Sequence, residues 1–214
     1  MKKEKLNKLL TKVFLKHKLS KTHAKICSDA LVNAELVGAT GHGVSRLKMY
    51  CDRIRKKLIN PKPKFKFKKI SQSIMQIDAD DSIGFVAADI GIKKAIESAK
   101  KTGIGLVGIK RSGHYGLSGY YAEQAVKKNL LTLIFTNAPP AIAPHGALKT
   151  LFGTNPICFG TPTSSKVPFI LDTSISMINR GKIRVAARTG SKIPEGVALD
   201  KYGRPTTDAA KALK

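Results

Sequence analysis

Apolar residues in the first quarter of the chain recur at the spacing of helix faces. In residues 6–14, Leu, Val and Phe side chains return every three or four positions, which indicates an amphipathic helix. Ser20 is a preferred type of N-cap residue and can begin a second helix, which carries Ala24 and Leu31 on its inner side. Residues 47–54 show the same periodicity. The pattern predicts a helical unit in residues 1–60.

Residues 62–68 alternate lysine with Pro63, Phe65 and Phe67. A period of two is typical of a strand with one buried face. A lysine-rich outer face protects an exposed sheet edge from aggregation. We therefore expect a half-buried basic strand here, followed by a second short strand at residues 73–78.

From residue 84 the pattern changes to alternating helices and strands. Residues 104–109 form a short apolar run that predicts a buried strand with a helix on either side. Such alternation indicates βαβ units with right-handed crossovers. After Pro139 the chain is rich in proline and is predicted to be mostly loop. The predicted fold class is α/β, with the helical unit followed by an α/β domain over residues 61–214. Its further expected elements are helices at residues 85–101 and 120–128 and strands at residues 130–136 and 169–172.

The chain is strongly basic, with 39 lysines and arginines against 14 aspartates and glutamates and a net charge of +25. A charge of this size suits a polyanion such as a nucleic acid. The lysines are spread along helix-like faces, however, with no aromatic-rich basic platform among them. We interpret them as solvated faces that attract anionic substrates or cofactors, and a nucleic-acid-binding protein is the third interpretation weighed.

Cys27, Cys51 and Cys158 are odd in number and widely spaced. This argues against a disulfide framework or a zinc site and for a reducing, cytoplasmic compartment. No apolar run approaches the ~20 residues that span a bilayer, and the N-terminal residues do not form a signal-peptide core. We therefore expect no membrane association.

Residues 103–108 match the string G-x-G-x-x-G. A dinucleotide-binding fingerprint follows a strand and opens a helix. This string instead follows a predicted helix and overlaps a predicted strand, so we predict no Rossmann dinucleotide site.

Two histidines stand in glycine-rich turns. His114 follows the predicted strand and precedes a helix, where bare backbone N–H groups can face an anion and an imidazole can transfer a proton. The alternative is a tight turn with a solvated histidine. His42 lies four residues before Arg46, and an arginine can hold a carboxylate while an imidazole transfers a proton. The alternative there is a surface ion pair of Arg46 and a helix cap by His42.

Three later turns carry polar side chains or lie at a strand end. Thr154 stands in a Gly-Thr-Asn-Pro turn, and Asp172 follows a predicted strand. Ala138 lies at a strand end, where open α/β sheets tend to bind ligands. Turn formation and helix capping explain the same residue types, so none of these turns is specific alone.

Taken together and in order, these strings resemble the malate/L-lactate dehydrogenase family, whose members do not use a Rossmann fold. The resemblance implies a non-Rossmann NAD(P)-binding α/β domain. It also implies hydride transfer between NAD or NADP and a small 2-hydroxy acid or its 2-oxo counterpart, and a homodimer. The matching stretches cover nearly the whole chain after residue 35: residues 42–47, 112–118, 137–140, 153–156, 172–174, 180–182 and 193–208.

The resemblance also implies roles for individual residues. His42 and His114 match catalytic proton-transfer positions, and Arg46 matches the residue that holds the substrate carboxylate. Further substrate positions are matched by Thr154, Arg180 and Gly181. Cofactor-binding positions are matched by His114, Tyr115, Gly116, Leu117, Ser118, Ala138, Asp172, Thr173 and Ser174. No metal ligand is implied.

The chain departs from the family pattern in three respects. Gly41 stands where the imine-reducing members usually have serine, and Ala138 stands where a hydroxyl-bearing residue is usual. Each change removes about one hydrogen bond, roughly 0.5–1.5 kcal/mol. Family chains also continue beyond the length of this one, so the resemblance implies an α/β domain incomplete at its C-terminal end. A truncated, non-catalytic remnant of the family is therefore the second interpretation.

Overall fold

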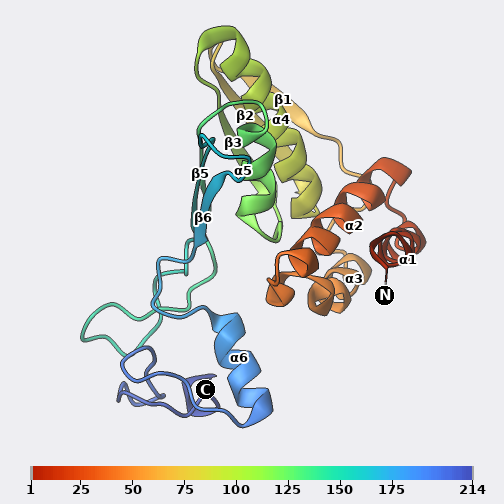
Figure 1. Cartoon of the computed structure of the whole chain (residues 1–214). Coiled ribbons are helices and arrows are strands. Elements are labelled where there is room, and N and C mark those ends of the chain that lie inside the picture. Colours follow the sequence, from red (N-terminus) through yellow and green to blue (C-terminus); the bar gives the residue numbers. More distant parts are fainter. Residues whose placement is uncertain (1, 214) are drawn as a thin grey trace. The chain divides into compact units, whose positions relative to one another are not determined.

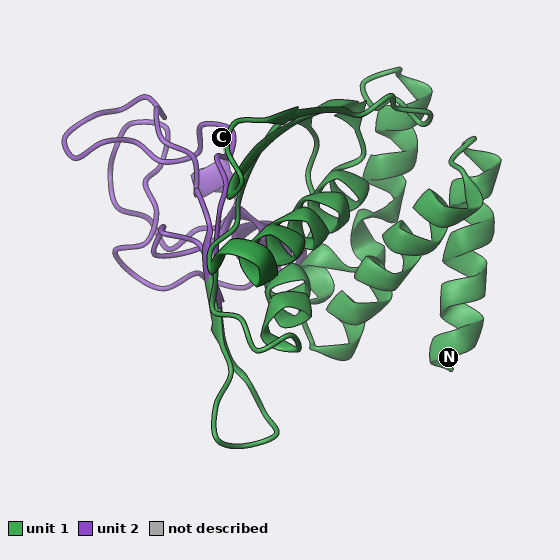
Figure 2. Cartoon of the chain, turned by 90° about the horizontal axis from the view of Figure 1, so that it is seen from above, with its two compact units in different colours: residues 1–132, 159–170 green, residues 133–158, 171–214 purple. Residues whose placement is uncertain are grey.

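The computed structural model describes residues 2–213 and divides into two compact units. Unit 1 contains the chain up to Thr132 together with residues 159–170, and unit 2 contains residues 133–158 and 171–214 (Figure 2). Unit 1 carries most of the regular structure. The division at residue 60 that the sequence suggests stays a prediction.

The N-terminal helices of unit 1 form as the apolar periodicity predicts. Ser20 begins the second helix, and its Oγ accepts a hydrogen bond from the backbone N–H of His23 at 3.1 Å. Leu10, Phe14 and Leu31 are fully buried between the helices, which explains their spacing. The helices are α1 (Lys3–Lys16), α2 (Lys21–Leu36) and α3 (Leu47–Arg55), with two single 3₁₀ turns, η1 (Thr40–His42) and η2 (Val44–Arg46), before α3 (Figure 1).

The first sheet of unit 1 contains the βαβ unit predicted from the alternation. Strand β1 (Lys66–Lys69) pairs antiparallel with β2 (Ile74–Ser82), and β2 pairs parallel with β3 (Leu106–Ser112). Helix α4 (Gly84–Thr102) connects β2 to β3 and packs on both strands (Figure 1). Its N-terminal residues join the core of the helices, because Phe85 and Val86 are buried in the same cluster as Phe14 and Leu31.

Two expectations about burial are wrong. Strand β3 was predicted to be buried, but Leu106 is 55% exposed and most of the strand is open. Val107 and Ile109 contact α4 at Gly91, so only one face of the strand is covered. Strand β1 is exposed along its whole length, including Phe67, whereas Phe65 just before it packs against the helical core.

The G-x-G-x-x-G string has the context that excludes a dinucleotide fingerprint, as predicted. Gly103 ends α4 in the left-handed region, with φ of 81°, and β3 begins three residues later. Glycine is the usual residue at such a C-terminal position because it adopts positive φ without steric cost. The string therefore joins a helix to a strand.

An ion-pair cluster fastens the ends of β2 and β3 just before the His114 turn. The Arg111 guanidinium lies 3.3, 3.1 and 2.6 Å from carboxylate oxygens of Asp78, Asp80 and Asp81. The register of the two strands shifts between Asp78 and Ser82. Arg111 therefore ties the irregular end of β2 to β3 at the point where the chain turns toward His114.

The second sheet has the strand order β4-β5-β6. The boundary between the two units passes through these strands. Within unit 1, Gly160 of β5 lies against Ala122 and Val126 of α5 and Thr132 of β4, so this glycine permits close approach of helix and strand. The elements are α5 (Ser118–Val126), β4 (Thr132–Phe135), β5 (Ile157–Thr161) and β6 (Phe169–Thr173).

Unit 2 has more regular structure than the proline content predicts. Helix α6 (Arg180–Thr189) buries Ile183 in a small core with Ile193 and Ala209, and a 3₁₀ turn, η3, follows at Lys211–Leu213. Strand β5 and helix α6 were both expected to be loop. Within residues 2–213, none of the helices is long and apolar enough to cross a membrane.

Candidate active site

His42 and Arg46 lie on the two short turns that precede α3. Regular α-helix begins only at Leu47, the residue after Arg46. Glu35 fastens this region, since its Oε1 accepts a hydrogen bond from the backbone N–H of Val44 at 2.7 Å. A Cβ atom on Gly43 would lie 2.1 Å from that oxygen. The glycine in the His-Gly-Val string thus makes room for Glu35.

The turn that carries His114 packs on the N-terminal end of α4. The backbone N–H of Gly113 donates to the carbonyl oxygen of Ser82 at 3.2 Å. A Cβ atom on Gly84 would lie 2.1 Å from the carbonyl oxygen of Gly113 and 2.5 Å from that of His114. The backbones of strand β2, helix α4 and the turn are therefore in direct contact. This contact fixes the position of the His114 backbone, from which the imidazole extends.

Helix α5 holds the other side of this turn. The buried Tyr121 hydroxyl donates to the carbonyl oxygen of Tyr115 at 2.9 Å, and the Tyr115 and Ser118 hydroxyls lie 2.9 Å apart. Leu117 is the N-cap residue of α5 and provides no side-chain hydrogen bond to the helix. The N-cap residue therefore provides no polar side chain at the positive end of the α5 helix dipole.

The His42 and His114 rings lie face to face although 72 positions separate them in the chain. Their centroids are 5.8 Å apart and their planes differ by 7°. The Arg46 side chain curls back toward the same turn, because its Nε donates to the carbonyl oxygen of Gly41 at 2.7 Å. All three residues belong to unit 1, so the structure gathers two imidazoles and a guanidinium in one place.

Tyr50 is a member of this group that sequence reasoning missed. Its hydroxyl oxygen lies 2.6 Å from His114 Nδ1, and its ring is fully buried. The sequence places it on the inner face of α3, which suggests packing alone. Tyr50 stands four residues after Arg46, the residue that precedes α3. This is the spacing of neighbouring side chains on a helix surface, and it is the signal that could have indicated Tyr50.

The surroundings of His114 keep its imidazole neutral. Burial, as the largest cause, together with the nearby His42, Arg46 and Arg53 lowers the pKa of His114 from 6.5 to about 4. A buried cation loses hydration, and positive neighbours disfavour a further positive charge. The ring therefore enters any reaction near neutral pH with one proton and one lone pair.

This lowered pKa predicts a pH-dependent contribution to stability. The unfolded chain binds a proton at His114 below pH 6.5, whereas the folded chain binds it only near pH 4. The free energy of unfolding is then expected to fall by about 3 kcal/mol through this group as the pH drops from 6.5 to 4. Urea unfolding of the wild type and His114→Gln at several pH values checks this, and equal acid losses in both proteins would contradict it.

The remaining predicted site residues belong to unit 2. There the Asn155 side-chain oxygen accepts a hydrogen bond from the N–H of Ala138 at 2.9 Å, and the carbonyl oxygen of Thr154 accepts one from the N–H of Ile175 at 3.0 Å. The turn with Thr154 therefore lies beside the end of β6, which holds Asp172 and Thr173 and is followed by Ser174. Arg180 and Gly181 begin α6, where Asn179 Oδ1 caps the helix through the N–H of Lys182.

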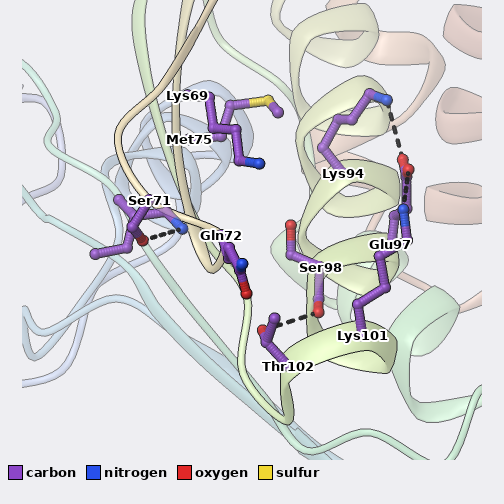
Figure 3. A pocket seen from close by; sticks show the side chains of 10 residues that line it. Lys69, Ser71, Gln72, Met75, Lys94, Glu97, Ser98, Lys101 and Thr102 are labelled. Carbon is purple, nitrogen blue, oxygen red and sulfur yellow. Dashed lines mark hydrogen bonds and ion pairs between the residues drawn. The ribbon is translucent and has the colours of Figure 1, made fainter.

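A hollow in unit 1 holds none of the predicted site residues. It has a volume of about 360 Å³ and lies between the turn after β1 and the last turns of α4 (Figure 3). The His114 turn lies at the opposite, N-terminal end of α4. No group of three or more metal-ligating side chains occurs in the described part of the chain.

The fold is shared with known enzymes. A family model for malate/L-lactate dehydrogenase matches residues 1–214. The chain belongs to the malate/L-lactate dehydrogenase family. Among malate/L-lactate dehydrogenases, the L-sulfolactate dehydrogenase of Methanocaldococcus jannaschii is 40% identical over 214 residues, which are 100% of this chain and 62% of that protein. Its solved structure superposes with a TM-score of 0.91. The Entamoeba histolytica malate dehydrogenase structure gives 0.95 at 31% identity, over 100% of this chain and 59% of that one.

Relatives within the malate/L-lactate dehydrogenase family use either nicotinamide cofactor. The ureidoglycolate dehydrogenase of Escherichia coli K12, named for NAD(+), is 31% identical over 96% of this chain and 59% of that protein. The (2R)-3-sulfolactate dehydrogenase of Chromohalobacter salexigens, named for NADP(+), is 37% identical over 89% of this chain and 57% of that protein. The predicted α/β fold and the family are thus confirmed. The chain spans about three fifths of the length of these curated relatives.

Proposed function

We propose that this chain is an NAD(P)-dependent oxidoreductase that interconverts a small 2-hydroxy acid and its 2-oxo acid. The observation that carries the proposal is the neutral His114 imidazole beside Arg46 and His42. Reduction of a 2-oxo acid needs a proton for the carbonyl oxygen and a cation for the carboxylate. His114 supplies the first need and Arg46 the second. The His42 ring stacks on that of His114 and so belongs to the same site.

The residues of unit 1 fit a phosphate-bearing nicotinamide cofactor. The turn of residues 113–117 leads into α5, whose N-cap has no polar side chain, and helix N-termini bind phosphate groups. We assign the cofactor contacts to His114 and the four residues after it, with Ala138, Asp172, Thr173 and Ser174 of unit 2 as further members. When bound, the nicotinamide supplies or takes the hydride at C2 of the substrate.

We assign the further substrate contacts to Thr154, Arg180 and Gly181. The relatives act on malate, sulfolactate and ureidoglycolate, as their names state. Each of these molecules carries a hydroxyl group beside a carboxylate, which suits the pairing of His114 with Arg46. The net charge of +25 favours anionic small molecules in the same way.

Two further assignments accompany this function. The three cysteines are free and buried, which supports a cytoplasmic protein. A homodimer is proposed from the family resemblance. Nucleic acid is not proposed as a partner, and tight duplex binding at physiological ionic strength with a steep salt dependence would contradict that view.

The proposed function is tested by following nicotinamide absorbance at 340 nm. Oxaloacetate, pyruvate and 3-sulfopyruvate would each be supplied with NADH and with NADPH to the 214-residue chain. The expected result is consumption of one cofactor with at least one of these acids. A folded chain that consumes neither cofactor with any of them would favour the non-catalytic remnant.

Replacement of Arg46 by lysine is expected to raise KM about tenfold with a smaller change in kcat. Lysine keeps the charge but cannot form two parallel hydrogen bonds to a carboxylate, and a lost charge-assisted hydrogen bond costs about 1.5–3 kcal/mol. Steady-state kinetics check the prediction, with Arg55→Lys as the matched control, because Arg55 is exposed on α3 and pairs with Asp52. An unchanged KM in Arg46→Lys would place the carboxylate elsewhere.

A further inference from the structure

We infer that Tyr50 is a positioning residue that, with the backbone N–H of Gly116, fixes the tautomer of His114 so that its ring presents an Nε2–H donor to the substrate oxygen. The inference rests on the proposed function for its chemical meaning. The arrangement of Tyr50, Gly116 and His114 is observed independently of it.

The Gly116 contact decides which ring nitrogen carries the proton. The backbone N–H of Gly116 points to His114 Nδ1 at a nitrogen–nitrogen distance of 3.3 Å. A backbone N–H can only donate, so Nδ1 must be an acceptor. In a neutral imidazole the proton then lies on Nε2.

The same contact settles the direction of the Tyr50 hydrogen bond. A phenol hydroxyl can donate or accept, but Nδ1 without a proton can only accept, so the Tyr50 hydroxyl donates across the 2.6 Å separation. Two donors thus converge on one lone pair. A proton on Nδ1 would have to face the Gly116 N–H, which cannot turn away because Gly116 is held in the left-handed region at φ 81° and closes on the Phe85 ring.

Burial makes this arrangement rigid. Tyr50 is fully buried, and its ring packs on Phe85 at a centroid distance of 4.9 Å. The neighbours that lower the pKa of His114, besides burial, are His42 on η1, Arg46 on η2 and Arg53 on α3. All of them disfavour imidazolium, so the neutral Nε2–H form persists through the neutral pH range.

The proton balance of the reduction then passes through Tyr50. With a bound nicotinamide cofactor to supply a hydride at C2, the substrate carbonyl oxygen would take the proton of His114 Nε2–H. In the same step Nδ1 would take the Tyr50 hydroxyl proton along the existing hydrogen bond, which keeps the imidazole neutral. This Nδ1–H would face the Gly116 N–H, so the proton stays on Nδ1 only until Nε2 is protonated again. The phenolate that remains lies near Arg46 and Arg53, which both lower the pKa of Tyr50 against the larger, opposite effect of burial. After product release, water protonates Nε2, and Nδ1 returns its proton to Tyr50.

In the resting site His114 Nε2 carries a proton, which is the protonation state that reduction of a 2-oxo acid requires. For oxidation of a hydroxy acid, Nε2 must first give up its proton before it can accept one from the substrate. Tyr50 and Gly116 thus favour a 2-oxo acid as the substrate that binds first to the neutral ring.

The test combines a spectrum that needs no turnover with kinetics. Nitrogen-15 NMR of the histidine rings in the 214-residue chain at pH 7 is expected to show His114 as the Nε2–H tautomer. In Tyr50→Phe the Nδ1 signal should move toward that of an acceptor with fewer hydrogen bonds. The kcat for reduction should fall at least about tenfold, the effect of one hydrogen bond of about 1.4 kcal/mol, with KM within about twofold.

Tyr120→Phe is the matched control, because it removes a hydroxyl group from a partly buried tyrosine on α5 that lies outside the group of His42, Arg46 and His114. It should leave the His114 signals and kcat unchanged. An Nδ1–H tautomer in the wild type, or a Tyr50→Phe variant with unaltered Nδ1 signal, would overturn the inference. If the wild type reduces no 2-oxo acid, the proposed function fails, and the NMR spectrum still decides the tautomer.

Discussion

Replacing His114 by alanine is expected to lower kcat by at least about a hundredfold, because positioned general acids and bases contribute roughly 10²–10⁴-fold. The turn that carries His114 is held by backbone contacts to Gly113 and Tyr115, neither of which uses the imidazole. The fold should therefore survive. Steady-state kinetics of both proteins, with circular dichroism as the test of folding, check the prediction.

His17→Ala provides the control for this variant, since His17 lies at the end of α1, outside the proposed site. It should keep the kcat of the wild type. Full activity of a folded His114→Ala protein would mean that another group moves the proton, and His42 would then be the candidate through its adjacent ring.

Gly84→Ala is expected to be strongly destabilising for a change of a single methyl group. The added Cβ would lie 2.1 Å from the carbonyl oxygen of Gly113 and 2.5 Å from that of His114. Both atoms are backbone, so no side-chain rotation relieves the overlap. Overpacking of a buried site typically costs 1–3 kcal/mol, and we expect a loss of about 3 kcal/mol in the free energy of unfolding together with a displaced His114 turn.

Gly108→Ala is the matched control, because an added Cβ there meets nothing within 4 Å and β3 is exposed at that point. Urea unfolding of both variants gives the comparison. Equal stabilities of Gly84→Ala and Gly108→Ala would show that α4 and the His114 turn are not in backbone contact.

The helices and the βαβ unit could be predicted because their apolar residues follow one period without interruption. The stripe in α1 and the Ser20 cap are local features, and both are confirmed. Strand β5 was missed because it is only five residues long and is preceded by Pro156 and followed by Pro162. Helix α6 was missed because its charged residues break the apolar stripe that buries Ile183.

Burial was harder to predict than element type. The run of apolar residues in β3 indicated a strand buried on both faces, but helix α4 covers only one of them. An apolar sequence indicates that a strand can be buried. Whether one or both faces are covered depends on which elements pack against the strand in the tertiary structure. The same reason explains the exposed Phe67 in β1.

The site was predictable only in its separate parts. The spacing of His42 and Arg46 indicated one functional segment and the glycines around His114 another, but their stacking joins positions that no local pattern connects. Tyr50 illustrates the limit most clearly. An apolar helix face predicts packing for it, and only the fold brings its hydroxyl to His114 Nδ1.

Transfer of deuterium from NADH or NADPH labelled at C4 of the nicotinamide tests the central claim most directly. The 214-residue chain would be incubated with the labelled cofactor and each 2-oxo acid, and the products would be analysed by mass spectrometry. We predict a 2-hydroxy acid that carries one deuterium at C2, formed at least about a hundredfold more slowly by His114→Ala. Absence of deuterated hydroxy acid from the folded wild-type chain would contradict the proposed hydride transfer.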